Sequence, residues 1–162
     1  MNIGVTGHQR LRDNTAWAWV ELQIEQFLRR VPAPITGLSS LAIGADQLFA
    51  AALLRRGGTL DVIVPFQGYE DQFVSPVDRA EYKVLISKAR SITVLPRVGS
   101  DEDCYYAAGK AISDKADVVV AVWDGLPPKG LGGTADIVAY ALNLPKTVLH
   151  INPIQLTVVE IG

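Results

Sequence analysis

The alternation of short apolar runs with longer amphipathic segments is the feature of this 162-residue chain that most constrains its fold. The runs are rich in β-branched residues, which favour strands, and the longer segments carry apolar residues at helical spacing. Strands are expected at 2–6, 35–38, 60–64, 91–95, 117–123, 146–151 and 154–161, and helices at 17–31, 45–56, 77–89, 100–115 and 134–144. Strands separated by helices form right-handed βαβ units. We therefore predict a Rossmann-like, doubly wound α/β fold with a mainly parallel sheet in three layers, as a single domain over 1–162.

The composition narrows the classes of function. The formal net charge is −2 and no cluster of Lys or Arg appears, which argues against nucleic-acid binding through general phosphate attraction. Cys104 is the only cysteine, and no spacing typical of a metal site occurs, so we expect no metal and no required cofactor. The N-terminus does not resemble a signal peptide, and the longest apolar run, 118–123, is too short to cross a membrane. We expect a cytoplasmic protein without membrane association.

Ligands of open α/β sheets bind beyond the carboxyl ends of the strands, so the loops that follow the strands carry the candidate site residues. The loop after 2–6 contains Gly7, His8 and Arg10. A glycine lets the backbone approach a ligand, and an arginine can hold a phosphate through two parallel hydrogen bonds. His8 can donate to a phosphate or act as an acid or base. The loop lacks the GxGxxG fingerprint, so a dinucleotide dehydrogenase fits poorly.

The loop after 35–38 combines small residues with a helix start. Ser39 and Gly44 precede a helix whose first N–H groups can hold an anion. Asp46 lies in the first turn of that helix. It either binds a sugar hydroxyl or caps its own helix and the neighbouring loop, and the sequence leaves both interpretations open. The longer connection at 67–78 is polar and without a clear period, so we predict that it is the most mobile loop.

The loop after 117–123 carries the strongest signal. Its candidate residues are Trp123, Asp124, Lys129, Gly130, Gly132, Gly133, Thr134 and Asp136. Bare backbone amides at a helix start, together with the helix dipole, form an anion site, to which the threonine hydroxyl and the lysine add a donor and a charge. The tryptophan either stacks on a base or packs against the sheet. The spacing is not that of a Walker A loop. We predict that this loop binds the phosphate of a nucleotide-type small molecule.

Taken in order, the three loops resemble the SLOG superfamily, the Rossmann-like group that includes the Smf/DprA and Lonely-guy proteins. The segment 36–46 looks like the SGLA-x-G-x-D segment of DprA, and 132–134 looks like the phosphate-binding Gly-Gly-x-Gly-Thr turn of Lonely-guy proteins. The opening 5–10 is similar to that of YpsA-like members. The resemblance implies a nucleotide or nucleotide-derived ligand. Some members hydrolyse N-glycosidic bonds, and others only bind or sense.

One position departs from the enzymes of this group. Lonely-guy phosphoribohydrolases carry a catalytic Glu three residues after the Thr of the turn, and so do the nucleoside 2-deoxyribosyltransferases that 116–134 also resembles. Here that position is Ile137, which can neither stabilise a sugar cation nor act as a nucleophile. We therefore favour binding or sensing of a nucleotide without turnover.

Two alternatives remain open at this point. The first is an N-glycosidic hydrolase or transferase acting on a nucleoside or nucleotide, with Asp136, Asp46 or Asp124 as the catalytic acid or nucleophile. The second is single-stranded DNA binding in the manner of DprA, which the missing basic patch disfavours. We also expect a homo-oligomer, with the apolar segment 154–161 and the pair Trp17 and Trp19 as candidate contact surfaces.

Overall fold

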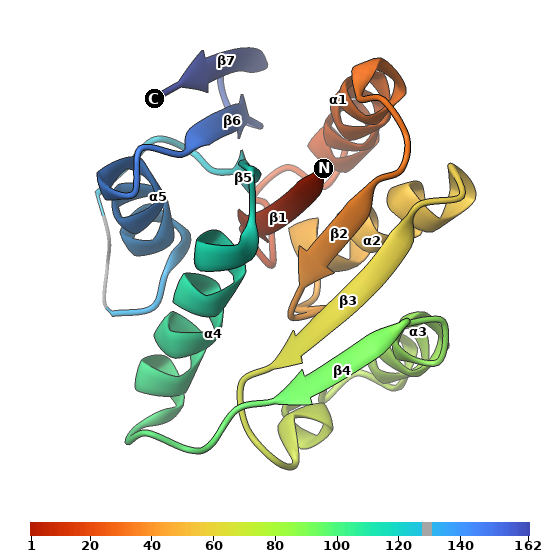
Figure 1. The fold of residues 1–162 in the computed structure, drawn as a ribbon, viewed down its shortest axis with the longest axis vertical. Coiled ribbons are helices and arrows are strands. Elements are labelled where there is room, and N and C mark those ends of the chain that lie inside the picture. The colour runs from red at the N-terminus through yellow and green to blue at the C-terminus, as the bar shows by residue number, and fades with distance from the viewer. Residues whose placement is uncertain (128–130) are drawn as a thin grey trace.

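The computed structural model describes residues 1–127 and 131–162, and within them one seven-stranded sheet has the strand order β4-β3-β2-β1-β5-β6-β7 (Figure 1). The strands are β1 (Asn2–Gly7), β2 (Thr36–Ser39), β3 (Thr59–Val64), β4 (Ser91–Val94), β5 (Val118–Val122), β6 (Thr147–Asn152) and β7 (Thr157–Ile161). The helices are α1 (Ala16–Arg30), α2 (Ala45–Arg55), the short 3₁₀ helix η1 (Tyr69–Gln72), α3 (Pro76–Ile86), α4 (Asp101–Lys115) and α5 (Thr134–Asn143). The predicted Rossmann-like α/β fold is confirmed, with element boundaries displaced by one or two residues at most ends.

The strand order reverses next to the first strand, and this reversal fixes where a ligand can bind. From β1 the chain builds β2, β3 and β4 outward on one side, then returns to place β5 and β6 on the other. All these pairs are parallel, and only β7 joins the sheet antiparallel, at its edge. The loops after β1 and β5 therefore diverge to opposite faces, which opens a crevice at the carboxyl end of the sheet.

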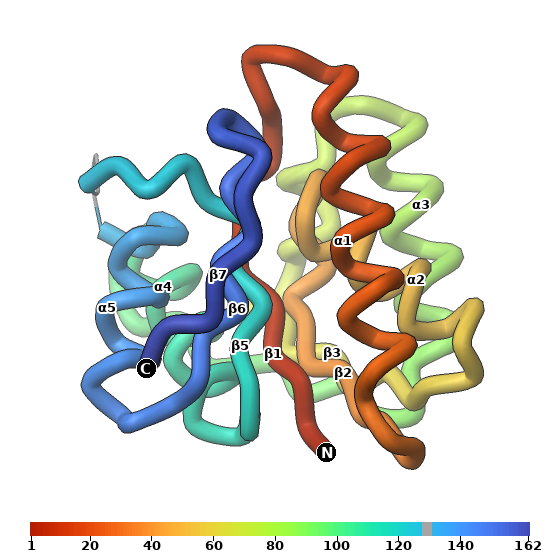
Figure 2. The backbone as a smooth tube through the Cα atoms, turned by 90° about the horizontal axis from the view of Figure 1, so that it is seen from above, coloured from red at the N-terminus to blue at the C-terminus, as the bar shows by residue number. Residues whose placement is uncertain are grey.

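Helices cover both faces of the sheet, as Figure 2 shows: α1, α2 and α3 lie on one face, and α4 and α5 lie on the other. The helix α2 approaches the sheet closely because Gly37 in β2 has no side chain, so that Phe49 and Leu53 lie directly over it. Both of these side chains are fully buried. Each buried side chain of this size contributes about 1.5–3 kcal/mol relative to an exposed one. No helix in the described part of the chain is both long and apolar enough to span a bilayer.

The segment 67–78 is anchored by aromatic side chains that its polar composition conceals. Tyr69 and Phe73 are buried, and their rings meet edge to face with centroids 5.3 Å apart. Tyr82 of α3 joins them, at 4.7 Å from Phe73. Packing of this kind holds both ends of η1 on the core, and the mobility of the segment stays a prediction.

The two surfaces expected to make oligomer contacts differ in exposure. Ile154, in the turn before β7, and Val159, in β7 itself, are 61% and 50% exposed. Trp17 and Trp19 are both partly buried and pack against the core below α1. The β7 edge thus keeps the exposed apolar character of a contact surface, and the oligomeric state stays a prediction.

Candidate functional site

A cavity of about 860 Å³ lies at the carboxyl end of the sheet, where the strand order reverses. The loops after β1, β2 and β5, the start of α5 and one face of α4 form its walls. The predicted residues that line it are Gly7, His8, Arg10, Asp46, Trp123, Asp124, Gly132, Gly133 and Thr134. The fold therefore brings together side chains from all three loops that the sequence singled out. We call this cavity the cleft.

Other predicted residues lie elsewhere. Ser39 is fully buried beneath the loop after β2, and Asp136 does not line the cleft, its Oδ2 accepting instead from the Gly132 amide. Gly44 lines a smaller cavity, of about 370 Å³, on the other side of the Gln9 backbone. Lys129 and Gly130 lie outside the described residues.

The start of α5 has the geometry of an anion site. Gly133 precedes the helix with an extended backbone, and in the described part of the chain no partner accepts the amide hydrogens of Thr134 and Ala135. Both residues line the cleft. The Gly132 amide is already used, because it donates to Asp136 Oδ2 at 3.0 Å. An incoming anion would therefore meet two free N–H groups at the positive end of the α5 dipole.

Gly132 fixes the position of this turn against α4. Its φ is +83°, a region that favours glycine, and a Cβ there would lie 2.6 Å from the carbonyl oxygen of Glu102. The turn can lie this close to the first turn of α4 because the residue has no side chain. Gly132, predicted from the sequence to belong to a phosphate-binding turn, is thus also required for the packing of this turn against α4.

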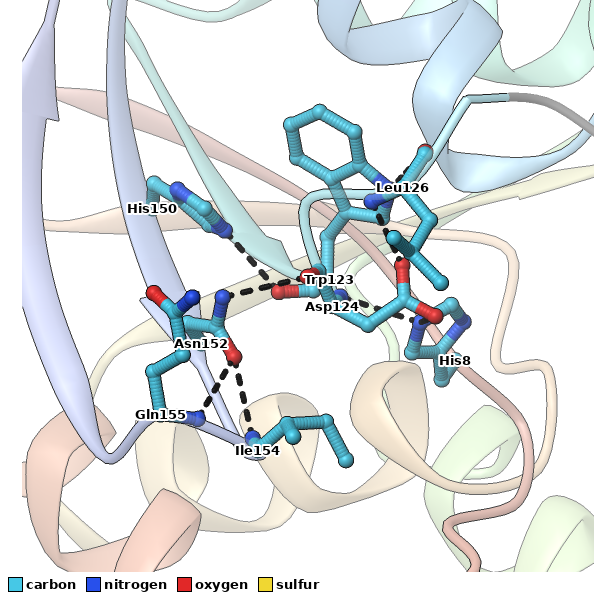
Figure 3. Close-up of polar contacts among 8 residues, drawn as sticks. All are labelled: His8, Trp123, Asp124, Leu126, His150, Asn152, Ile154 and Gln155. Atoms are coloured by element: carbon cyan, nitrogen blue, oxygen red, sulfur yellow. Dashed lines mark hydrogen bonds and ion pairs between the residues drawn. The ribbon is translucent and has the colours of Figure 1, made fainter.

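The loop after β5 is held by hydrogen bonds from three directions (Figure 3). Asn152 donates to the Asp124 carbonyl oxygen at 3.2 Å, and His150 Nε2 lies 2.9 Å from the Trp123 carbonyl oxygen. The Trp123 indole N–H donates to Leu126 O at 3.0 Å, and its ring packs on the His150 ring at 5.0 Å. The loop is therefore preorganised, and Trp123 lines the cleft while packing on the sheet side.

The Asp124 carboxylate takes part in the same network. Its Oδ1 accepts the Leu126 amide hydrogen at 3.0 Å, and its Oδ2 lies 3.3 Å from His8 Nε2. The same His8 nitrogen lies 3.1 Å from the Asp124 backbone nitrogen. These contacts tie the loop after β1 to the loop after β5, so Asp124 is held in place by two partners at the rim of the cleft.

Asp46 holds the loop after β2. Its Oδ2 accepts from the Ser39 hydroxyl at 2.9 Å and from the Ser40 amide at 3.0 Å, and the Ser39 oxygen in turn accepts from Leu41 N. Burial raises the pKa of Asp46 to about 6, against the lowering effect of these hydrogen bonds. Of the two interpretations left open by the sequence, the structure shows the capping of the loop, although Asp46 also reaches the cleft wall.

Ile137 occupies the position at which the Lonely-guy enzymes, which the sequence resembles, carry a catalytic Glu. It is 3% exposed and lies over Gly109 of α4, where an added Cβ would collide with the isoleucine side chain. This contact joins α5 to α4 beneath the cleft. The position is therefore filled by an apolar contact between helices, and no carboxylate stands there.

Two tyrosines that were not among the predicted site residues line the cleft on the β3 side. Tyr69 comes from η1 and Tyr105 from α4. The available sequence signal is the run of aromatic residues directly after β3, with Phe66, Tyr69 and Phe73 within eight positions. In a doubly wound sheet that position follows a strand's carboxyl end, where site residues gather.

The arrangement defines a Rossmann-like α/β protein with its cleft at the topological switch point, and known structures share this fold. A structure of DNA processing protein A (DprA) from Streptococcus pneumoniae has a TM-score of 0.62 and 16% identity, over 92% of this chain and 49% of that one. A second, from Helicobacter pylori and described for its single-stranded DNA binding mode, has a TM-score of 0.64 and 13% identity, over 93% and 64%. The Moco carrier protein from Chlamydomonas reinhardtii has a TM-score of 0.56 and 20% identity, over 92% and 74%.

These likenesses concern the fold. No family model and no curated protein matches the sequence. The chain spans about half to two thirds of the two DprA structures. The strand order and these three structures confirm the Rossmann-like fold that the SLOG resemblance implies, and at 13–20% identity the likeness extends to the fold alone. The YpsA-like branch stays a prediction.

Proposed function

We propose that this chain binds a nucleotide or nucleotide-derived ligand in the cleft, with a phosphate group on the amides of Thr134 and Ala135. The observation that carries the proposal is a pair of N–H groups in the cleft wall, at the start of a ten-residue helix, that find no acceptor within residues 1–127 and 131–162. Backbone amides at such a position favour an anion through hydrogen bonds and through the helix dipole.

We call the amides of Thr134 and Ala135 the phosphate seat, and the side chains around them suit a phosphate monoester. Arg10 lines the cleft and is exposed, and among the described residues it forms no ion pair, so its guanidinium is available for two oxygens of the ligand. His8 lies on the same loop. The volume of about 860 Å³ falls within the range of small-molecule sites. Trp123 offers an aromatic surface in the same wall.

Binding without turnover is the form of the proposal that the site favours. Ile137 fills the place of the family's catalytic carboxylate, and the carboxylates of Asp46, Asp124 and Asp136 each accept hydrogen bonds from their own loops. Incubation with AMP and with nucleosides, followed by chromatography, should yield no free base. Release of base that Asp136→Ala abolishes would instead support the glycosidase alternative.

Calorimetric titration with AMP of two variants of one residue tests the phosphate seat. Thr134→Pro removes one amide hydrogen, and proline fits this position because Gly133 before it is extended, with φ −76° and ψ 170°. Thr134→Ala removes the hydroxyl and keeps the amide. We expect Thr134→Pro to weaken AMP binding by about tenfold or more, and Thr134→Ala by about threefold at most.

Control measurements show whether the variant is folded and which results would contradict the proposed AMP site. Unchanged thermal unfolding of Thr134→Pro shows that the helix start is intact. Equal AMP affinity of the two variants, or no AMP binding by the wild type, would contradict the proposal. A salt-dependent complex with single-stranded DNA that AMP does not displace would support the DprA-like alternative, which the net charge of −2 disfavours.

A further inference from the structure

The cleft has a second polar region, on the β3 side, that the proposed phosphate seat does not use. It consists of Tyr69 and Tyr105, whose ring centroids lie 6.2 Å apart at an interplanar angle of 66°. Tyr69 is 5% exposed, and its ring also packs edge to face on Phe66, Phe73 and Tyr82. The rings are therefore fixed by packing, and their hydroxyl groups remain to contact a ligand.

Within residues 1–127 and 131–162, no hydrogen-bond partner reaches the hydroxyl of Tyr69 or of Tyr105, and the fully buried unpaired polar side-chain atom in those ranges is Arg79 Nε. The Tyr69 hydroxyl is therefore not fully buried. Tyr69 lines the cleft, so the cleft is the open space that this hydroxyl can reach. An unpaired polar group in a largely apolar surrounding is costly unless a ligand or water binds it.

The field around Tyr69 is negative. Burial raises the pKa of Tyr69 well above its ordinary value, and the nearby Asp46 carboxylate raises it further. The phenol thus stays protonated and available as a donor. A second anion placed between Tyr69 and Asp46 would be repelled.

The charges around Tyr105 are also mainly negative. Burial raises the pKa of this phenol, Asp101 and Glu102 raise it further, and Arg97 lowers it by less. The charge of Arg97 is itself offset, because its guanidinium pairs with Asp101 at 2.8 Å and lies over the Phe66 ring at 4.3 Å. This end of the cleft therefore favours an uncharged group that can hydrogen-bond.

We infer that the hydroxyls of Tyr69 and Tyr105 form a second subsite, which binds the uncharged sugar or base part of the ligand while its phosphate lies on α5. The inference rests on the proposed nucleotide site and gives the ligand a direction: anionic end toward Thr134, neutral polar end toward β3. Sugar hydroxyls and base edges share the chemistry required, since both accept hydrogen bonds from a phenol.

Removal of the hydroxyls alone tests this subsite. Tyr69→Phe and Tyr105→Phe keep the aromatic packing, and Tyr82→Phe is the matched control, because Tyr82 belongs to the same aromatic cluster and does not line the cleft. Calorimetry would compare inorganic phosphate, ribose 5-phosphate and AMP. We expect each of the two cleft variants to weaken AMP binding by about fivefold to tenfold and to leave inorganic phosphate binding within about twofold, with Tyr82→Phe unchanged for both.

The outcomes distinguish the two proposals. Loss of affinity for ribose 5-phosphate as well as AMP assigns the subsite to the sugar, and loss for AMP alone assigns it to the base. AMP binding that neither variant weakens, or equal weakening of AMP and inorganic phosphate, overturns the subsite and leaves the phosphate seat standing. Absence of AMP and phosphate binding by the wild type overturns both.

Discussion

One ring nitrogen of His8 faces both a donor and an acceptor of Asp124. His8 Nε2 lies 3.1 Å from the Asp124 backbone nitrogen and 3.3 Å from the Asp124 carboxylate. The backbone nitrogen can only donate, so this contact requires an Nε2 without a proton, whereas an ion pair with the carboxylate requires a protonated one. The two loops at the rim of the cleft are therefore joined through one of two alternative hydrogen bonds, according to whether His8 Nε2 carries a proton.

This geometry predicts opposite tautomers for the two histidines of the chain. Neutral His8 should carry its proton on Nδ1, because Nε2 accepts from Asp124 N–H. His150 should carry its proton on Nε2, because that atom lies 2.9 Å from the Trp123 carbonyl oxygen, which can only accept. Long-range ¹H–¹⁵N correlation spectra at pH 8 distinguish the tautomers. Finding the Nδ1–H form at both residues, or the Nε2–H form at both, would show that one of these contacts is not formed.

Asp46 predicts a fall of stability with rising pH. Its folded pKa of about 6 lies above the ordinary 3.8, so the folded state binds this proton more tightly than the unfolded state. The resulting stabilisation is fully present below about pH 4 and is lost as the pH rises through 6, a change of about 3 kcal/mol. Asp46→Asn keeps an oxygen for Ser39 and Ser40 but does not titrate.

Urea unfolding at intervals from pH 4 to 7.5 measures this effect. The free energy of unfolding of Asp46→Asn minus that of the wild type should increase with pH over this range and then level off. The difference isolates the carboxyl group, since all other titrating groups are shared. A flat difference would mean that the donors around Asp46 offset the effect of burial, and a difference that decreases with pH would mean that they stabilise the anion more than burial destabilises it.

The contact of Ile137 with Gly109 predicts a reversal of sign in a double-mutant cycle. In the wild type, Gly109→Ala forces a methyl group against the isoleucine and should destabilise the protein by about 1–3 kcal/mol. In an Ile137→Ala background the space is free, and the same substitution should be neutral or stabilise by up to about 1 kcal/mol, because alanine is the better helix former. Denaturant unfolding of the four proteins measures the coupling. Equal effects in both backgrounds would refute the contact.

Much of the fold and part of the site could be predicted from local pattern. The β-branched run that became β5 and the glycines before Thr134 are local signals, and a parallel sheet brings the loops after β1, β2 and β5 to one edge. Position in the chain was thus enough to place His8 and Arg10 in the same cleft as Thr134.

The remaining features depend on burial and on contacts formed only in the folded chain, which residue spacing does not reveal. Asp46 accepts hydrogen bonds from residues six and seven positions earlier, and its burial decides its role. Tyr69 enters the cleft because aromatic residues of η1, α3 and α4 pack together. The packing of Ile137 on Gly109 likewise joins two helices, α4 and α5, that are separated by β5 in the chain.

The amides of Thr134 and Ala135 are the groups whose resonances report on the proposed phosphate site. In a ¹H–¹⁵N correlation titration with AMP, both resonances should move to lower field along saturable curves that share one dissociation constant, since each N–H gains a charged acceptor. Inorganic phosphate should move the same two resonances in the same direction. Saturable AMP binding that shifts other amides and leaves these two in place would contradict the central claim.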